Sequence, residues 1–151
     1  MIIIAESPPA SGRYFYDVEG AVTEPLFSAL MKQLRLSPTI KERGLRAFQQ
    51  LGWLLVDATY EPVNILSEAN RQKIILRDYS LLRQDLSDIV GKNSTPLVLI
   101  KANICRLLGP RLVADGLTVI NQGRHIYFPS HGRQPQFHMQ FQEVLKTAGM
   151  Q

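Results

Sequence analysis

The sequence begins with a short apolar run that two prolines bring to an end, and this feature constrains the fold more than any other. Residues 2–5 read Ile-Ile-Ile-Ala, and such a run of β-branched residues is typical of a buried central strand. Pro8 and Pro9 lack the backbone N–H that strand pairing needs, so the strand cannot continue past Ser7. Glu6 and Ser7 are therefore placed at its carboxyl end, which is where open α/β sheets bind ligands.

Similar apolar runs alternate along the chain with segments of helical periodicity. The expected strands are residues 2–5, 53–56, 96–100 and 116–120, with 126–128 as a fifth strand or a continuation of the fourth. The expected helices are residues 24–34 capped by Thr23, 40–51, 67–90 capped by Ser67, 102–108 ended by Gly109-Pro110, and 134–147. Strands that alternate with helices predict a three-layer α/β/α sandwich around a central, mainly parallel sheet of four to five strands.

Length and composition limit the class of protein. The 151 residues suffice for a single domain covering residues 1–151, and 45% hydrophobic with 20% charged residues is the composition of a soluble globular protein. No apolar run is long enough to span a membrane, and the first run is too short for a signal peptide. We therefore expect no membrane association.

Cysteine, histidine and net charge bear on location and partners. The single Cys105 excludes an internal disulfide and a cysteine-based metal cluster, so a cytoplasmic location is expected. His125, His131 and His138 have no Cys or carboxylate partners at zinc-like spacing, and we expect neither a metal nor another cofactor. The net charge of +4 is compatible with an anionic partner such as DNA, single-stranded nucleic acid or a nucleotide.

Two loops at strand ends carry candidate site residues. The loop of residues 6–23 is too long for a simple connection, and ordered loops of this length are usually functional. Asp57 ends the second expected strand, so a parallel sheet places it beside Glu6 and Ser7. Both loops are therefore expected at one edge of the sheet.

Four segments, taken in order, resemble the motifs of the uracil-DNA glycosylase superfamily. Residues 3–9 (Ile-Ile-Ala-Glu-Ser-Pro-Pro) resemble its first motif, a strand that runs into a proline-containing turn. Residues 54–57 (Leu-Leu-Val-Asp) are similar to its middle motif, and residues 97–100 resemble the strand before its last motif. Residues 128–131 (Phe-Pro-Ser-His) resemble its terminal His-Pro-Ser-Pro turn. The resemblance covers nearly the whole chain and implies a uracil-DNA glycosylase-like α/β/α fold.

The resemblance also implies a function in DNA repair. A hydrolase of this kind cleaves the N-glycosidic bond of a damaged or unusual base in a flipped or single-stranded nucleotide. It needs a base pocket, an aromatic stacking platform and stabilisation of the departing base anion. The implied catalytic residues are Glu6, Ser7 and His131, the implied base-binding residues are Phe15, Tyr16 and Asp57, and the implied phosphate-binding residues are Ser130, Gly132 and Arg133.

Several positions depart from the motifs of that superfamily. Ser7 stands where the best-known members carry an Asp or Asn that positions water, and Phe128 replaces the histidine that stabilises the leaving base. Gly132 stands where duplex-penetrating members keep a bulky wedge. Asp57 replaces an asparagine, and an ionised carboxylate only accepts hydrogen bonds, so it favours a base edge that presents an amino group. A second function stays open: a non-catalytic module that binds a nucleotide or nucleic acid and keeps the fold.

The same residues also have structural interpretations. Glu6 either caps its loop by accepting backbone N–H bonds or belongs to the site. Asp57 either turns the chain by bonding Thr59 or Tyr60 or faces the ligand. The aromatic residues 14–16 either anchor their loop in the core or supply one ring for stacking.

Overall fold

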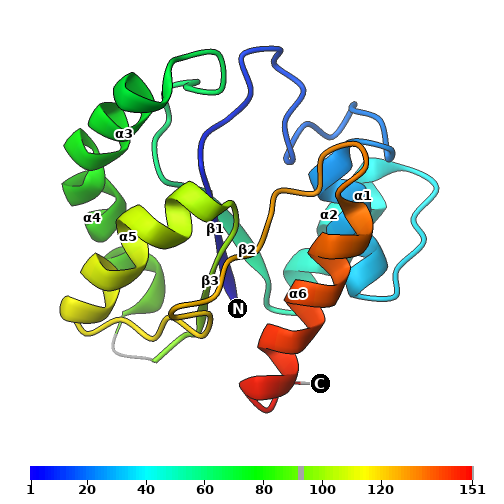
Figure 1. Cartoon of the computed structure of the whole chain (residues 1–151). Coiled ribbons are helices and arrows are strands. Elements are labelled where there is room, and N and C mark those ends of the chain that lie inside the picture. Colours follow the sequence, from blue (N-terminus) through cyan, green and yellow to red (C-terminus); the bar gives the residue numbers. More distant parts are fainter. Residues whose placement is uncertain (92–93, 151) are drawn as a thin grey trace.

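The structure, a computed structural model, describes residues 1–91 and 94–150 (Figure 1). Within these residues the strands are β1 (Ile2–Ala5), β2 (Leu54–Asp57) and β3 (Leu97–Leu99). The helices are α1 (Pro25–Gln33), α2 (Lys41–Gln50), α3 (Glu68–Arg77), α4 (Tyr79–Val90), α5 (Ala102–Ala114) and α6 (Gln134–Thr147). The fold is therefore α/β, as the alternation of apolar runs and helical segments predicts.

The three strands form one parallel sheet in the order β2-β1-β3. The central position of β1 accounts for its apolar sequence, since Ile3 and Ile4 are fully buried. The register pairs Ala5 with Asp57 on one side and Ile4 with Leu99 on the other. All three strands end at the same edge, so the residues at their carboxyl ends lie together.

Helices cover both faces of the sheet and give three layers. Successive residues of β1 point to opposite faces, because side chains alternate along a strand. Ile3 packs into an aromatic cluster that includes Phe27, Phe48 and Phe141 of α1, α2 and α6, whereas Ile4 packs into an aliphatic cluster with α3, α4 and α5. Figure 1 shows these two groups of helices on either side of the sheet.

The expectation of a fourth strand at residues 116–120 is wrong. This segment reaches the sheet only at Val119, which forms an isolated parallel bridge with Leu97. Beyond the bridge, the side-chain amide of Asn121 takes the place of strand backbone. Its Oδ1 accepts a hydrogen bond from Leu99 N at 3.0 Å, and its Nδ2 donates to Leu99 O at 2.9 Å. Because this amide satisfies the edge of β3, the ladder needs no further strand residues there.

Residues 126–128 do not form the expected fifth strand either. The carbonyl of Ile126 accepts a hydrogen bond from Lys101 N at 2.7 Å, and Tyr127 N donates to the Gln140 side chain at 2.9 Å. These backbone groups are used by the start of α5 and by α6. The described sheet therefore has three strands rather than four to five.

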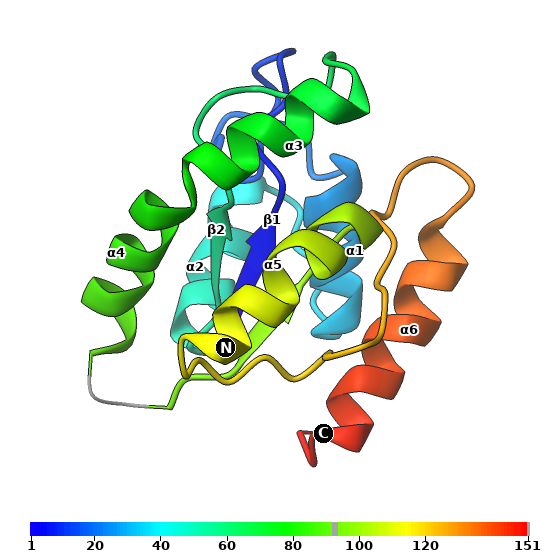
Figure 2. The same cartoon turned by 60° about the vertical axis from the view of Figure 1, so that its left-hand side comes forward.

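Two helix boundaries differ from the expectation in the first half of the chain. Glu24, not Thr23, caps α1, since its carboxylate accepts hydrogen bonds from the backbone N–H of Leu26 at 3.0 Å and of Phe27 at 2.7 Å. The expected helix 67–90 is divided at Asp78 into α3 and α4, which run in different directions (Figure 2). The Asp78 carboxylate accepts a hydrogen bond from the Thr59 hydroxyl and so ties this corner to the loop after β2.

Gly109 and Pro110 do not end α5, which continues to Ala114 with the proline inside it. Leu108 and Leu112 are fully buried one turn apart, and burial of this face outweighs the hydrogen bond that proline removes. The last helix agrees with the sequence-based boundaries, 134–147. Across the part of the chain that the structure describes, no helix is both long and apolar enough to cross a membrane.

Candidate functional site

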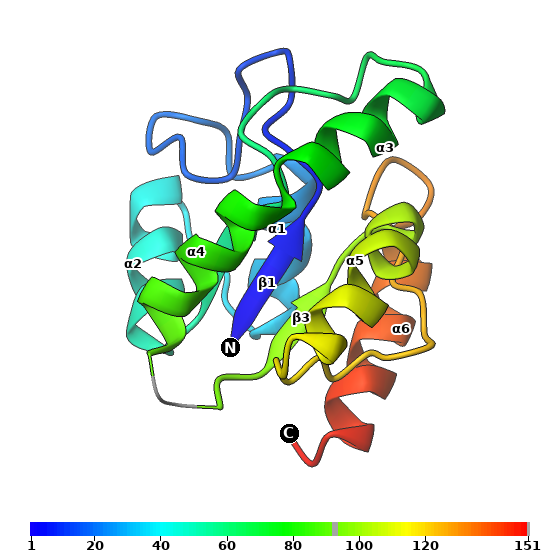
Figure 3. The same cartoon turned by 90° about the vertical axis from the view of Figure 1, so that its left-hand side faces the viewer.

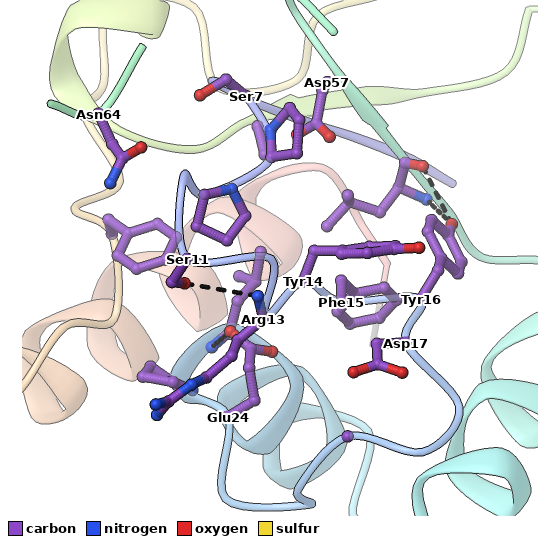
Figure 4. Close-up of a pocket in the computed structure, with 18 of the residues that line it drawn as sticks. Ser7, Ser11, Arg13, Tyr14, Phe15, Tyr16, Asp17, Glu24, Asp57 and Asn64 are labelled. Atoms are coloured by element: carbon purple, nitrogen blue, oxygen red, sulfur yellow. Dashed lines mark hydrogen bonds between the residues drawn. The ribbon is translucent and has the colours of Figure 1, made fainter. Parts of the chain in front are cut away.

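A cavity of about 640 Å³, here called the main cavity, opens at the edge where the strands end (Figure 4). Its walls come from the loops after β1 and β2, the start of α1 and the segment around Ser130. The predicted site residues that line it are Glu6, Ser7, Phe15, Tyr16, Asp57 and Ser130. Segments from opposite ends of the chain thus meet where the parallel sheet predicts.

Glu6 is 6% exposed, and side chains from three elements hold its carboxylate. Lys101, which follows β3, pairs with Oε2. Asn103, at the start of α5, donates from Nδ2 to Oε1 at 2.5 Å, and the Arg71 guanidinium of α3 approaches Oε1 at 3.6 Å. No backbone N–H of residues 1–91 or 94–150 donates to this carboxylate, so the loop-cap interpretation of Glu6 is wrong. Its partners are side chains.

Lys101 is a site residue that the sequence motifs do not single out. It lies two residues after Leu99, the last residue of β3, and directly after the expected strand of residues 96–100, so the strand-end rule that selects Glu6 and Asp57 also selects Lys101. Its backbone has a φ of +82°, a left-handed conformation uncommon outside glycine. The hydrogen bond from Lys101 N to Ile126 O and the ion pair with Glu6 hold the residue at the cavity wall. Arg71 and Asn103 carry no comparable signal in the sequence.

Asp57 lies in a different environment at the same edge, near Ser7 (Figure 4). Among the described residues, none donates a hydrogen bond to its carboxylate, so the turn-forming interpretation of Asp57 is wrong. The turn is made by Thr59, whose Oγ1 accepts a hydrogen bond from Glu61 N at 3.1 Å. Burial raises the pKa of Asp57 to about 6, because the carboxylate loses water without gaining a partner. Asp57 therefore changes its charge close to neutral pH.

Two of the three consecutive aromatic residues of the first loop, Phe15 and Tyr16, anchor that loop. Phe15 is 5% exposed and packs edge-on against Phe48, with 5.1 Å between ring centroids. The Tyr16 hydroxyl donates to Leu55 O at 3.0 Å and accepts from Leu55 N at 2.8 Å, which satisfies the free edge of β2. Tyr14 is half exposed. Because all three rings line the main cavity, the loop is both anchored in the core and part of the cavity wall.

The buried side chain of Lys41 in α2 also fixes the position of this loop. Its side chain is 2% exposed, its Nζ donates to Tyr14 O at 2.7 Å, and it lies 5.3 Å from the centroid of the Phe27 ring. Burial lowers the pKa of Lys41, although Glu24 and Asp17 act in the opposite direction. Lys41 also lines the main cavity, so its ammonium group adds positive potential there.

Besides the backbone bond from Thr59 N to Glu6 O at 3.2 Å, side-chain hydrogen bonds join the loops after β1 and β2. Ser7 Oγ accepts from Val63 N at 3.3 Å, and Asn64 Oδ1 accepts from Ala10 N at 2.9 Å. Ser7 therefore has a structural contact, but a hydroxyl keeps its own proton and a second lone pair for a water or a ligand. The Ser7 hydroxyl can therefore still hold a water molecule, in addition to its contact with Val63 N.

The predicted catalytic and phosphate-binding residues at positions 130–133 lie only partly at the main cavity. Ser130 lines this cavity, whereas His131 and Gly132 are exposed and line neither it nor the smaller cavity described next. The guanidinium of Arg133 stacks over the Tyr127 ring at 4.7 Å from its centroid. The structure therefore does not bring His131 together with the other two predicted catalytic residues, Glu6 and Ser7.

A smaller cavity of about 320 Å³, here called the side cavity, adjoins the main cavity and shares Lys101, Phe128 and Ser130 with it. The remaining lining residues are Glu68, Arg71, Ala102, Asn103, Tyr127 and Arg133. Figures 2 and 3 show the segment 126–133 passing beside the start of α5, where these residues meet. Two of the predicted phosphate-binding residues, Ser130 and Arg133, line this side cavity.

Neither cavity offers a ready metal site. In residues 1–91 and 94–150, no group of three or more His, Cys, Asp or Glu side chains is placed to hold a metal ion. Cys105 is buried in the aliphatic cluster, and burial raises the pKa of its thiol. The polar and aromatic side chains that line the main cavity supply carboxyl, ammonium, hydroxyl and aromatic groups, the guanidinium of Arg13 and the amide of Asn64.

A scan against protein-family models, a search of curated proteins and a search of solved structures each found no match for this chain. The resemblance to the uracil-DNA glycosylase superfamily thus rests on the four sequence motifs alone.

Proposed function

We propose that the protein is a divergent N-glycosylase that binds the base of a flipped or single-stranded nucleotide in the main cavity. The observation that carries the proposal is the meeting of Glu6, Ser7, Phe15 and Asp57, predicted from two separate motifs and one loop, in a single cavity. Its volume of about 640 Å³ is in the usual range of small-ligand pockets. An aromatic wall beside a polar edge suits a planar base with hydrogen-bonding groups.

The acid–base function belongs to Asp57 in this proposal, not to Glu6. The Glu6 carboxylate is already engaged by Lys101 and Asn103, which leaves it poorly placed to take a proton from water. Asp57 has no such partner within the described residues, and its pKa of about 6 suits a general acid near neutral pH. When protonated, its carboxyl both donates and accepts hydrogen bonds. It therefore matches a base edge that presents an amino group beside a ring nitrogen.

The proposed reaction is hydrolysis of the N-glycosidic bond. The C1′–N bond breaks, and the base leaves with the bonding electron pair and takes the proton of Asp57. A water molecule then adds to C1′, and the proton that it loses passes to the Asp57 carboxylate, which restores the acid. The products are a free base and an abasic sugar. Lys41 and Lys101 line the same cavity, and their positive charges favour the negative charge that develops on the departing base.

A panel of single-stranded oligonucleotides, each with one modified base, tests this function by release of the free base and cleavage of the abasic strand in alkali. We expect release from at least one oligonucleotide, falling as the pH rises past about 6 because Asp57 then loses its proton. Asp57→Asn should lower the rate by about 100-fold or more, the usual range for loss of a general acid. Asp88→Asn, an exposed acid on α4, is the matched control and should leave the rate unchanged.

The second candidate is a module that binds the nucleotide without cleaving it. Two specific observations favour it: the Glu6 carboxylate is engaged by its ion pairs, and His131 lies away from the main cavity. It predicts salt-sensitive binding of the same oligonucleotides with no base release at any pH. If no oligonucleotide is either bound or cleaved, both candidates are wrong.

A further inference from the structure

We propose that the side cavity is a phosphate site, so that the ligand of this protein is a phosphorylated nucleoside with its base in the main cavity and its phosphate against the start of α5. The base half of this ligand rests on the proposed function. The phosphate half rests on the side cavity alone, through its unpartnered polar atoms, its charges and its helix start.

Unpartnered polar atoms mark the side cavity. In the described part of the chain, three buried side-chain polar atoms have no hydrogen-bond partner, and two of them, Arg71 Nε and Asn103 Oδ1, belong to residues that line this cavity. Asn103 is 8% exposed, so its carbonyl is held out of water. A buried polar atom without a partner is costly, and such atoms call for a ligand or water. Arg71 Nε needs an acceptor, such as a phosphate oxygen, and Asn103 Oδ1 needs a donor, such as a hydroxyl group.

The charges of the side cavity suit an anion. Arg71, Lys101 and Arg133 line it, and the buried carboxylate of Glu6 compensates only part of their charge. Glu68 also lines the cavity, but its exposed carboxylate lies 3.5 Å from the guanidinium of Arg106, which does not line the cavity. The charge of Glu68 is therefore balanced by Arg106. The excess positive charge favours a phosphate over a neutral ligand.

The start of α5 adds donors to the same place. Ala102 and Asn103 begin this helix of 13 residues, and no side chain caps its first turn. Free N–H groups at a helix start and the positive end of the helix dipole favour an anion. The Arg133 guanidinium, stacked over Tyr127, lines the same cavity and donates to Gln136 Oε1 at 3.3 Å. Donors from the start of α5 and from Arg133 therefore line one cavity.

The shared wall of the two cavities links base and phosphate. Lys101, Phe128 and Ser130 line both, so a sugar placed between them keeps the base in one cavity and the phosphate in the other. The Asn103 carbonyl then accepts a hydrogen bond from a sugar hydroxyl or from a protonated phosphate oxygen. This arrangement predicts tighter binding of a nucleotide than of its nucleoside.

Isothermal titration calorimetry at low salt tests the proposal with four probes: inorganic phosphate, deoxycytidine, and its 5′- and 3′-monophosphates. We expect phosphate to bind, and at least one monophosphate to bind about tenfold or more tightly than deoxycytidine, as for charge-assisted hydrogen bonds. Arg133→Ala should remove most of that gain, and Ser130→Asp should do the same by repulsion. Both side chains are exposed, so the fold should persist. Arg46→Ala, which removes an exposed charge on α2, is the matched control and should bind as the wild type.

The outcomes separate this inference from the function proposed above. Phosphate binding that Arg133→Ala weakens supports the phosphate site even if no nucleoside binds, in which case the base-binding proposal fails by itself. Equal affinities for deoxycytidine and its monophosphates, with no binding of inorganic phosphate, overturn the phosphate site and leave the base cavity untouched. Equal effects of Arg133→Ala and Arg46→Ala overturn it too, because the attraction would then be general charge rather than this cavity.

Discussion

At the scale of single residues, the two carboxylates at the edge of the sheet lie in contrasting environments. Glu6 is buried with two cations and an amide around it, whereas Asp57 is largely buried without a hydrogen-bonding partner among the described residues. Neighbouring carboxyl groups in such different surroundings divide their functions, one as a fixed charge and one as a titrating group. Each environment leads to its own prediction.

Asp57→Asn should stabilise the protein at high pH and much less at low pH. The pKa of Asp57 is raised by burial from 3.8 to about 6, so the folded state tolerates the protonated carboxyl and resists its ionisation. The free-energy cost of holding the ionised Asp57 in the folded state is absent below pH 3.8, grows as the pH rises, and reaches its full value above about 6. Urea unfolding should therefore show a stability gain about 2 kcal/mol larger at pH 8 than at pH 4.5. A gain that is the same at both pH values would mean that Asp57 titrates normally.

Glu6→Gln should destabilise the protein strongly, because it leaves Lys101 and Arg71 without their buried carboxylate. We expect a loss of about 3 kcal/mol in the free energy of unfolding, as for breaking a buried ion pair. Glu42→Gln is the control, since it breaks an exposed pair with Arg46 on α2 and should cost at most about 0.5 kcal/mol. Similar losses in urea unfolding of the two variants would contradict a structural function of the Glu6 ion pairs.

At the scale of elements, two helical glycines that look alike in the sequence have opposite surroundings. An added Cβ at Gly44 of α2 would lie 2.4 Å from Phe27 Cζ and 2.9 Å from Pro38 Cγ. Apart from its neighbours in the chain and the backbone of its own helix, an added Cβ at Gly109 of α5 would meet Leu99 Cδ1, at 3.5 Å, an ordinary contact. The glycine of α2 therefore allows close packing against α1, and the glycine of α5 has no such steric reason.

Alanine at each position should consequently shift stability in opposite directions. Gly44→Ala should lower the free energy of unfolding by about 1–3 kcal/mol, because overpacking outweighs the better helix propensity of alanine. Gly109→Ala should raise it by less than about 1 kcal/mol, because Pro110, the next residue, disfavours helical backbone at a residue with a Cβ and offsets part of the propensity gain. Thermal unfolding of both variants beside the wild type measures the two shifts. A stabilised Gly44→Ala protein would show that α2 packs less tightly against Phe27 than described.

At the scale of the whole molecule, β1 belongs to both clusters at once. Ile3 lies in the aromatic cluster and Ile4 in the aliphatic cluster, and the two residues are adjacent. If the helices left either face of the sheet, apolar side chains of β1 would be exposed to water. The two layers of helices are therefore expected to unfold together.

Two probes test this cooperativity. Trp53 stacks near Phe141 at 6.1 Å between ring centroids and reports on the aromatic cluster, whereas far-ultraviolet circular dichroism reports on all helices. The two urea transitions should coincide, as in a single cooperative domain. Loss of the Trp53 signal at lower urea than the dichroism would show that the aromatic layer unfolds separately.

Local patterns of the sequence determine much of this fold. The apolar runs place the three strands, helical periodicity places α1, α2 and α6 within one or two residues, and strand-end position puts Glu6, Ser7 and Asp57 at one edge. These features depend on residues close together in the chain, where backbone preference and alternation decide the result. The same reasoning extends to Lys101, because it directly follows the expected strand of residues 96–100.

Only the tertiary structure decided which side chains meet. The partners of Glu6 lie far away in the chain, at Arg71, Lys101 and Asn103, and no local pattern marks Arg71 or Asn103. Asn121 likewise ends the sheet through a side-chain contact with Leu99, which a strand pattern cannot reveal. The short apolar run that opens the chain thus specifies where the site lies. The charge state of the carboxyl groups in that site is specified by long-range contacts, because burial and ion pairing depend on neighbours in space.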